Sequence, residues 1–174
     1  GFVLHMYAGS GLRSLPGYGA CDEAVCLQEA FDSARGVETM MARPFIAARY
    51  FDTVASRIPA AAVPWSTEFN LADDTLVTPG TWAHGLYLAL EEGLFSEHCS
   101  IALVHNLSGA SGRYSLMFRD ADQYAPFVGS PVTPVFGLSA AGYASSLFAR
   151  AVQSARVRTH LTFSPNPMRG LTAA

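Results

Sequence analysis

Hydrophobic and polar residues alternate in the middle of the chain in a way that is typical of a β-strand. Within residues 113–120, aromatic and aliphatic side chains gather on one face, as expected of a half-buried strand. Residues 99–106 carry hydrophobic side chains on both faces, which predicts a strand that is buried on both sides. The intervening residues 107–112 are rich in glycine and serine and suit a loop. The pattern predicts a β-hairpin of an all-β domain.

Patterns elsewhere predict further short elements. A short helix is expected over residues 22–34, and a helical turn that Pro44 closes is expected over residues 37–41. Residues 81–90 and 140–155 fit a strand or a helix equally well. The further strands are expected at residues 45–54, 65–71 and 157–163. About eight short strands, separated by prolines and glycines, indicate a β-sandwich or barrel.

The length of the chain suits a single domain. A chain of 174 residues can bury a sizeable core without disulfides or metals. Residues 1–20 are rich in glycine and aromatic residues and show no sustained period, so an irregular arm is expected there. The predicted organisation is an N-terminal arm with a short helix over residues 1–36, a β-sandwich over residues 37–164, and a C-terminal tail over residues 165–174.

The composition indicates a protein with little free surface. Hydrophobic residues make up 50% of the chain and charged residues only 14%, whereas about 25% is usual for charged residues in soluble domains. No uninterrupted apolar run reaches the ~18 residues of a membrane span, so no membrane partner is expected. Contacts with neighbouring protein chains would cover the excess of hydrophobic surface, because the cores of such interfaces are poor in charge.

The charges are distributed unevenly along the chain. All eleven basic residues are arginine, which tolerates interface burial better than lysine, although a GC-rich coding sequence explains the absence of lysine equally well. Residues 1–122 carry all fourteen acids, whereas residues 123–174 carry four arginines and no acid. One subunit's basic end could therefore meet another subunit's acidic flank. The net charge of −3 argues weakly against a broad RNA-binding surface.

Four segments bear a resemblance to a known family. Residues 35–45 read as a short helical lead-in with an Arg-Pro junction before the first strand, and residues 94–103 and 112–118 read as a turn, a rising strand, a loop and the next strand. Residues 157–169 read as a last strand and its tail. This order of segments resembles the capsid proteins of picorna-like viruses, and the end of the chain looks like the small coat protein of the plant viruses in that group. The resemblance covers roughly residues 35–169.

The resemblance implies an eight-stranded antiparallel jelly-roll β-sandwich with short helices and an extended N-terminal arm. It implies a structural capsid subunit, not an enzyme, that assembles with other coat protein chains into an icosahedral shell around a viral RNA genome. Its location would be the virion, and the host cytoplasm during assembly. No small-molecule substrate is implied. The residues expected at subunit interfaces are Phe2, Tyr7, Tyr18, Met40, Met41, Arg43, Arg156, Arg158 and Arg169.

The residues that could carry chemistry lack the spacing that chemistry needs. No two of the five histidines stand two or four residues apart, as a metal site on one strand or helix face would require. Cys21 and Cys26 are too far apart for a redox CxxC pair, and the odd count of three favours reduced thiols in a cytoplasmic setting. The acid pairs at residues 73–74 and 91–92 fall at predicted turns, where solvated carboxylates are ordinary. No catalytic residue, cofactor or metal is therefore expected.

Two other functions stay open at this point. An accessory structural subunit of a large organellar complex would share the hydrophobic, arm-bearing character. A monomeric β-sandwich ligand-binding protein, or a cupin-like enzyme, would instead act as a single chain without partner subunits. A particle of many copies that carries RNA favours the capsid, a place in an asymmetric complex favours the organellar subunit, and a soluble monomer with a bound ligand or metal favours the third.

Overall fold

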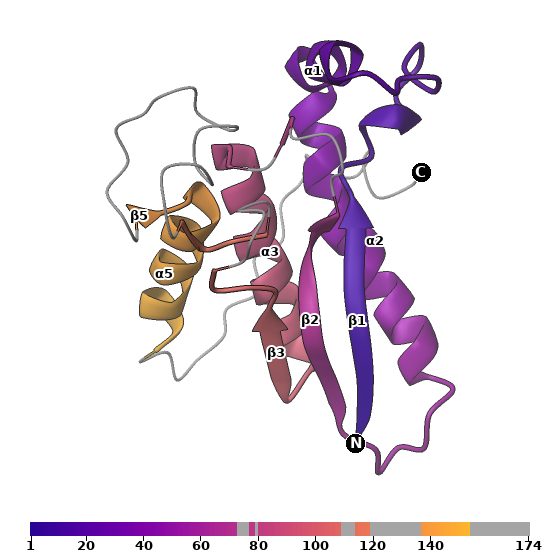
Figure 1. Cartoon of the computed structure of the whole chain (residues 1–174). Coiled ribbons are helices and arrows are strands. Elements are labelled where there is room, and N and C mark those ends of the chain that lie inside the picture. Colours follow the sequence, from indigo (N-terminus) through magenta and orange to yellow (C-terminus); the bar gives the residue numbers. More distant parts are fainter. Residues whose placement is uncertain (73–76, 79, 109–113, 119–136, 154–174) are drawn as a thin grey trace, which may run out of the picture.

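Parallel strands joined by helices form the centre of the molecule (Figure 1). The computed structural model describes residues 1–72, 77–78, 80–108, 114–118 and 137–153. Strands β1 (Phe2–Gly9), β2 (Pro64–Ala72) and β3 (Ile101–Val104) form one sheet in the order β1-β2-β3, and both neighbouring pairs are parallel. Because parallel neighbours need a long crossover, which is usually a helix, helical connections are expected between these strands.

The crossovers supply most of the helices. The 3-10 helix η1 (Leu12–Ser14) and helices α1 (Ala24–Asp32) and α2 (Gly36–Ala55) connect β1 to β2, and α3 (Trp82–His98) connects β2 to β3. Strands β4 (Met117–Phe118) and β5 (Gly137–Leu138) form a separate antiparallel pair. Helix α5 (Ala140–Val152) follows and packs along α3.

The two long crossover helices lie on the same face of the sheet. Crossovers between parallel strands are nearly always right-handed, so a sheet in the order β1-β2-β3 places successive helices on one side. Helices α2 and α3 accordingly pack together behind the sheet in Figure 1, and the rings of Phe51 and Phe95 lie 6.4 Å apart between them. Met6 of β1 and Phe69 of β2 point into this buried layer. In the part of the chain that the structure describes, no helix covers the opposite face.

The predicted all-β jelly roll is wrong, because the molecule is an α/β fold. The main error lies in residues 45–54, which were expected to form a strand but form the second half of α2. The buried residues of this helix recur at helical spacing through the proline, at Met40, Pro44, Ala47, Ala48 and Phe51. The expected turn over residues 37–41 is therefore the start of a helix of 20 residues, in which Pro44 is an interior residue.

Other expectations have mixed outcomes. The helix over residues 22–34 and the strand over residues 65–71 are confirmed by α1 and β2. The first residues, expected in an irregular arm, instead form β1. Residues 99–106 do contain strand β3, but it pairs with β2. The described residues of the expected partner strand, 114–118, instead include β4, which pairs with β5, and they contact the segment after β3 through backbone hydrogen bonds such as Leu116 N to Asn106 O. The expected strand at residues 157–163 and the tail at residues 165–174 lie outside the described residues.

Candidate functional site

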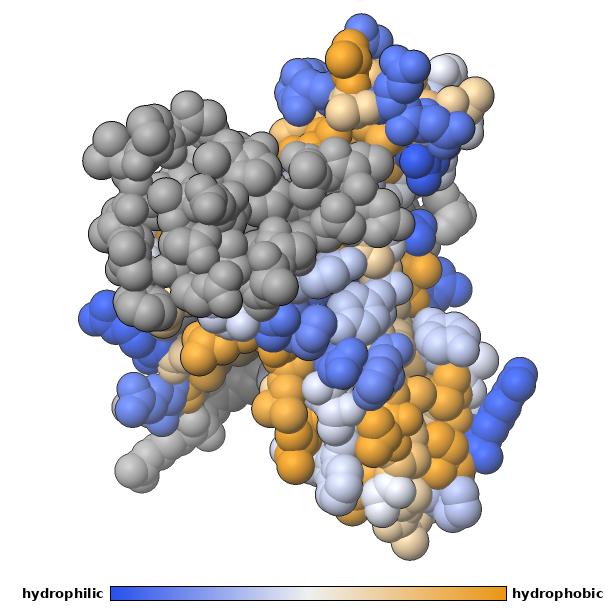
Figure 2. Space-filling model, in the orientation of Figure 1, coloured by the Kyte–Doolittle hydropathy of each residue, from blue (hydrophilic) through white to orange (hydrophobic). Residues whose placement is uncertain are grey.

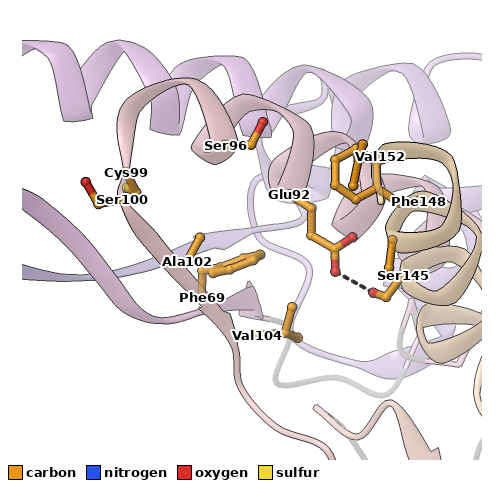
Figure 3. Close-up of a pocket in the computed structure, with 11 residues that line it drawn as sticks. Phe69, Glu92, Ser96, Cys99, Ser100, Ala102, Val104, Ser145, Phe148 and Val152 are labelled. Carbon is orange, nitrogen blue, oxygen red and sulfur yellow. Dashed lines mark hydrogen bonds between the residues drawn. The ribbon is translucent and has the colours of Figure 1, made fainter. Parts of the chain in front are cut away.

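A pocket of about 430 Å³ lies between α3, β3 and α5 (Figure 3). Its walls are mainly apolar, formed by Phe69 of β2, Val104 of β3, and Phe148 of α5. The face of β3 that lines the pocket is the one turned toward the helices. Two polar side chains, Glu92 of α3 and Ser145 of α5, face each other across it.

Glu92 supplies a carboxyl group to this apolar wall. The hydroxyl of Ser145 donates to its Oε1 at 2.6 Å. Its Oε2 is buried and has no hydrogen-bond partner among the described residues. Burial raises the pKa of Glu92 above the ordinary value of 4.5, and the hydrogen bond from Ser145 opposes that shift in part. The ionised carboxylate therefore receives one hydrogen bond, from Ser145, and its second oxygen receives none from the described residues.

Close contacts at the N-termini of α3 and α5 hold these two helices together. The side chain of Thr81 caps α3 by accepting from His84 N, and the side chain of Ser139 caps α5 by accepting from Gly142 N. At Gly85 of α3, an added Cβ would lie 2.6 Å from the backbone oxygen of Ala140. The helices can therefore approach this closely only because position 85 has no side chain.

Cys99 also lines the pocket, at the end of α3. It is a free cysteine and partly buried. Burial raises the pKa of its thiol, and a backbone hydrogen bond involving Ser66 opposes that shift in part. Because the thiolate is the reactive form, this environment does not activate Cys99 as a nucleophile.

A second polar group lies at the carboxyl ends of β2 and β3, where parallel sheets commonly bind ligands. Asn70 connects the parts of this group. Its amide donates to the backbone oxygens of His105 and of Tyr114, the latter at 3.1 Å. Its Oδ1 accepts from Leu71 N and lies 2.8 Å from Nε2 of His84. All hydrogen-bonding capacity of Asn70 is used inside the protein, so it fixes β2, β3 and α3 to one another and offers nothing to a ligand.

Glu91 is a third polar group, and it is fully buried on α3. Burial raises its pKa to about 8, the hydrogen bond from Tyr87 lowers it, and the charge of Glu92 raises it further. The hydroxyl of Tyr87 lies 3.5 Å from its Oε1, whereas its Oε2 has no partner among the described residues. The prediction of a solvated turn at residues 91–92 is wrong, because both acids lie inside a helix.

The open face of the sheet carries a mixed surface. Tyr7 donates to Glu68 at 2.9 Å, and Nδ1 of His5 lies 3.7 Å from the same carboxylate. The ring of Tyr7 makes edge contacts with the rings of His105 and Tyr114, at 6.1 and 6.0 Å between centroids. Figure 2 shows hydrophobic residues gathered over the lower half of this face.

The residues expected at subunit interfaces occupy several environments. Phe2 stacks on Phe51 at 6.3 Å, and Tyr7 lies on the open face of the sheet. Tyr18 packs against a hydrophobic cluster that includes Leu12. Met40 is fully buried in a second cluster with Leu71 and Tyr87, and Met41 packs against that second cluster. Arg43 donates to the backbone oxygen of Gly9 at 3.2 Å. The remaining three, Arg156, Arg158 and Arg169, lie outside the described residues, and the interface roles of the whole set stay predictions.

The prediction of free thiols at Cys21 and Cys26 is wrong. These two cysteines form a disulfide, with their Cα atoms 5.5 Å apart. Their spacing of five residues excludes a CxxC motif but does not exclude a bridge, because the chain bends where it enters α1. The sequence argument rested on the absence of a CxxC motif and on the odd count of three cysteines, and an odd count still allows one bridge. Cys99 is free, as expected.

Comparisons with known proteins identify no relative. No protein-family model, no curated protein and no solved structure matches the chain. Within the described ranges, no three histidine, cysteine, aspartate or glutamate residues lie together as a metal site would need. No helix in the same ranges has both the length and the apolar character needed to cross a bilayer.

The sequence reasoning missed the pocket, because its lining residues come from four separate elements. One signal for Glu91 and Glu92 was present in the sequence. The hydrophobic residues Tyr87, Leu88 and Phe95 stand at helical spacing around the acid pair. That spacing places Glu91 on the buried face of a helix and Glu92 beside it.

Proposed function

We propose that this chain is an α/β domain that binds a small, mainly apolar molecule in the pocket between α3, β3 and α5. The observation that carries the proposal is a pocket of about 430 Å³ with apolar walls and a single carboxyl group, that of Glu92. Ligand pockets of proteins are commonly 300–1,000 Å³, and they combine an apolar lining with few polar groups that orient the ligand. The pocket has both properties.

Binding is favoured over catalysis by the groups that line the pocket. A nucleophilic mechanism needs a base within hydrogen-bond reach of the nucleophile. Ser145 does lie 2.6 Å from Glu92, but it donates to a carboxyl whose ionisation is already resisted by burial. The thiol of Cys99 is likewise held in its protonated form by burial. These groups suit recognition of a ligand and do not form an activated nucleophile.

Filling the pocket tests the proposal. Ala102 lines the pocket on β3 and Ala149 lines it on α5, so Ala102→Leu and Ala149→Phe should each occupy the space. Ala60→Phe places a large side chain at an exposed loop position and serves as the control. We expect octanol and octylamine to produce saturable shifts in amide NMR spectra of the wild type and A60F, and at least tenfold weaker binding to both pocket variants. Equal binding to folded pocket variants, or no saturable binding of either probe to the wild type, contradicts the proposal.

The coat-protein role stays a prediction, and it has lost the fold from which it followed. The resemblance implied capsid assembly through a jelly roll, and the strands of this molecule are parallel and joined by helices. The low charge of the chain and its hydrophobic composition are the remaining support for any role in assembly.

A second candidate function, self-association, is favoured by the open face of the sheet. Val3, Trp65 and Ile101 lie side by side in register across the three strands, and Leu103 lies on the same face. These side chains are 52%, 37%, 43% and 52% exposed, respectively. Parallel sheets are almost always covered on both faces. We propose that a second copy of this chain covers the open face through these four residues.

A further inference from the structure

The pocket has one charged group in the part of the chain that the structure describes. Glu92 contributes a carboxyl, Ser145 and Ser96 contribute hydroxyls, and Cys99 contributes a thiol that burial keeps neutral. No arginine or histidine is among these lining residues. A ligand anion would therefore meet a carboxylate and no positive partner, whereas a ligand cation would meet its opposite charge.

The carboxyl of Glu92 lacks a donor that a ligand could supply. Its Oε1 accepts from Ser145, and its Oε2 is buried without a hydrogen-bond partner among the described residues. Buried carboxylate oxygens in folded proteins are almost always hydrogen-bonded or paired with a positive charge. Phe148 and Val152 of α5 line the same pocket as Glu92, so the carbon atoms attached to a donor that binds the carboxyl can pack against apolar side chains (Figure 3).

Glu91, the acid next to Glu92, is a second reason to expect a positively charged ligand group. Glu91 precedes Glu92 on α3, and the charge of Glu92 contributes to the raised pKa of Glu91. The described groups that donate to this pair, Tyr87 and Ser145, are neutral and donate to one oxygen each, and the one described positive charge that acts near the pair is that of Arg43 on α2, which acts on Tyr87. A positive charge beside Glu92 would therefore favour the ionised form of both acids.

We propose that the ligand of this pocket is an amine with an apolar body, whose ammonium group pairs with the carboxyl of Glu92 while its carbon chain packs against Phe69, Val104 and Phe148. This inference rests on the proposed function, and it adds the chemical class of the head group. Ser145 then acts as a positioning residue, because its hydroxyl donates to Oε1 and holds the carboxyl of Glu92 at the wall of the pocket. An ammonium that binds Glu92 stabilises the carboxylate, so amine affinity rises as the pH is raised above about 4.5 through the pKa of Glu92.

A series of probes with one chain length and three head groups tests the inference. Octylamine, octanol and octanoate present a cation, a neutral donor and an anion on the same apolar body. We expect octylamine to bind the wild-type protein about tenfold more tightly than octanol at neutral pH, and octanoate to bind most weakly. Calorimetric or NMR titration gives the three dissociation constants.

Glu92→Gln isolates the contribution of the charge. We expect it to weaken octylamine binding about tenfold and to leave octanol binding within twofold, because the amide keeps the size of the side chain and loses its charge. Glu29→Gln, at an exposed position on α1, removes one negative charge elsewhere and should change neither constant. A pH series should show the rise in octylamine affinity in the wild type and in E29Q, and a smaller rise in E92Q, in which Glu91 is the remaining acid beside the ligand.

The outcomes separate this inference from the proposed function. Equal affinities for octylamine and octanol, unchanged octylamine binding in E92Q, or tighter binding of octanoate would overturn the amine inference while the pocket remains a binding site. Absence of saturable binding for all three probes would overturn the proposed function itself. Saturable octylamine binding that Ala102→Leu does not weaken would place the amine elsewhere on the surface and overturn the inference as well.

Discussion

Glu91 is held in an environment that favours its protonated form. Its carboxyl is fully buried on α3, and burial raises its pKa to about 8 from an ordinary value of 4.5. Below about pH 4.5 the carboxyl is protonated in both the folded and the unfolded chain. Between about 4.5 and 8 the unfolded chain releases the proton and the folded chain retains it, so the free energy of unfolding falls as the pH rises. Above about 8 both states are ionised, and the loss is complete.

Glu91→Gln tests this linkage, because the amide stays neutral at every pH. We expect E91Q to be more stable than the wild type at pH 8 and to lose most of the decline in the free energy of unfolding between pH 4.5 and 8. The difference between the pKa of Glu91 in the folded protein and its ordinary value corresponds to a loss of at most about 5 kcal/mol in the free energy of unfolding. We expect E91Q to recover about 3 kcal/mol of this loss, because the amide changes the hydrogen bonding of the side chain. Urea unfolding at a series of pH values measures it.

Glu92 also has a raised pKa and contributes a decline of the same sign. The comparison between E91Q and the wild type therefore isolates Glu91, because Glu92 is present in both. Glu38→Gln, at an exposed position in the first turn of α2, is the matched control and should change stability by less than about 0.5 kcal/mol. A wild-type protein whose stability rises between pH 5 and 8 would contradict the assignment of a buried, protonated Glu91.

At the scale of the element, the approach of α5 to its neighbours depends on Gly142 of α5 as well as on Gly85 of α3. A Cβ at Gly142 would overlap the backbone oxygen of Leu116, whereas a Cβ at Gly93 would lie 3.7 Å from the ring of Phe148. Both glycines lie inside helices, so Gly→Ala should improve helix propensity by up to about 1 kcal/mol at either position. The overlap at Gly142 must displace backbone, and a backbone shift of that kind costs more than the gain in propensity.

We therefore expect Gly142→Ala to destabilise the protein by about 2–3 kcal/mol and Gly93→Ala to be neutral or stabilising. Thermal or urea unfolding of the two variants gives the comparison. Because α5 forms one wall of the pocket, G142A should also weaken octanol binding in the folded protein. Equal stability of G142A and G93A would mean that α5 does not approach residue 116 as closely as the structure places it.

The elements differ in how far the sequence alone could predict them. The strand at residues 65–71 and the helix at residues 22–34 have local patterns that agree with their final state. Helix α2 was not predicted, because proline usually ends a helix and Pro44 lies inside this one. The helical spacing of hydrophobic residues nevertheless continues on both sides of Pro44. Residues 81–90 could not be decided by period, since α3 is apolar around most of its circumference, and packing on both the sheet and α5 made it a helix.

At the scale of the whole molecule, strand pairing decided the fold and the sequence did not contain a local signal for it. Residues 101–104 form a continuous hydrophobic run, which predicted a strand buried on both sides, yet β3 exposes Ile101 and Leu103, and such a run reads the same whether its neighbour is parallel or antiparallel. The pocket depends on the same pairing, because β3 reaches α5 only through the parallel position beside β2. The candidate site could therefore be found only after the three strands and the helices between them were placed.

The same architecture predicts the strength of self-association through the open face. Two strands of about eight residues and one of four, spaced about 4.8 Å apart, present roughly 300 Å² of flat surface. Stable interfaces bury about 800 Å² per partner. The second copy should therefore bind weakly, and the association should depend on concentration in the micromolar range or above.

Ile101→Glu tests this surface, because it places a charge at the β3 end of the apolar row formed with Val3 and Trp65, on the same strand as Leu103. We expect sedimentation velocity to show a concentration-dependent dimer for the wild type and a monomer for I101E, with at least tenfold weaker association. Val25→Glu introduces the same charge at an exposed position on α1, away from the sheet, and should leave the dimer unchanged. A wild type that stays monomeric at the highest soluble concentration, or a dimer equally weakened by both substitutions, would show that a second copy does not cover this face. Folded spectra of both variants confirm that the comparison concerns association and not unfolding, since a solvent-exposed isoleucine contributes little to the core.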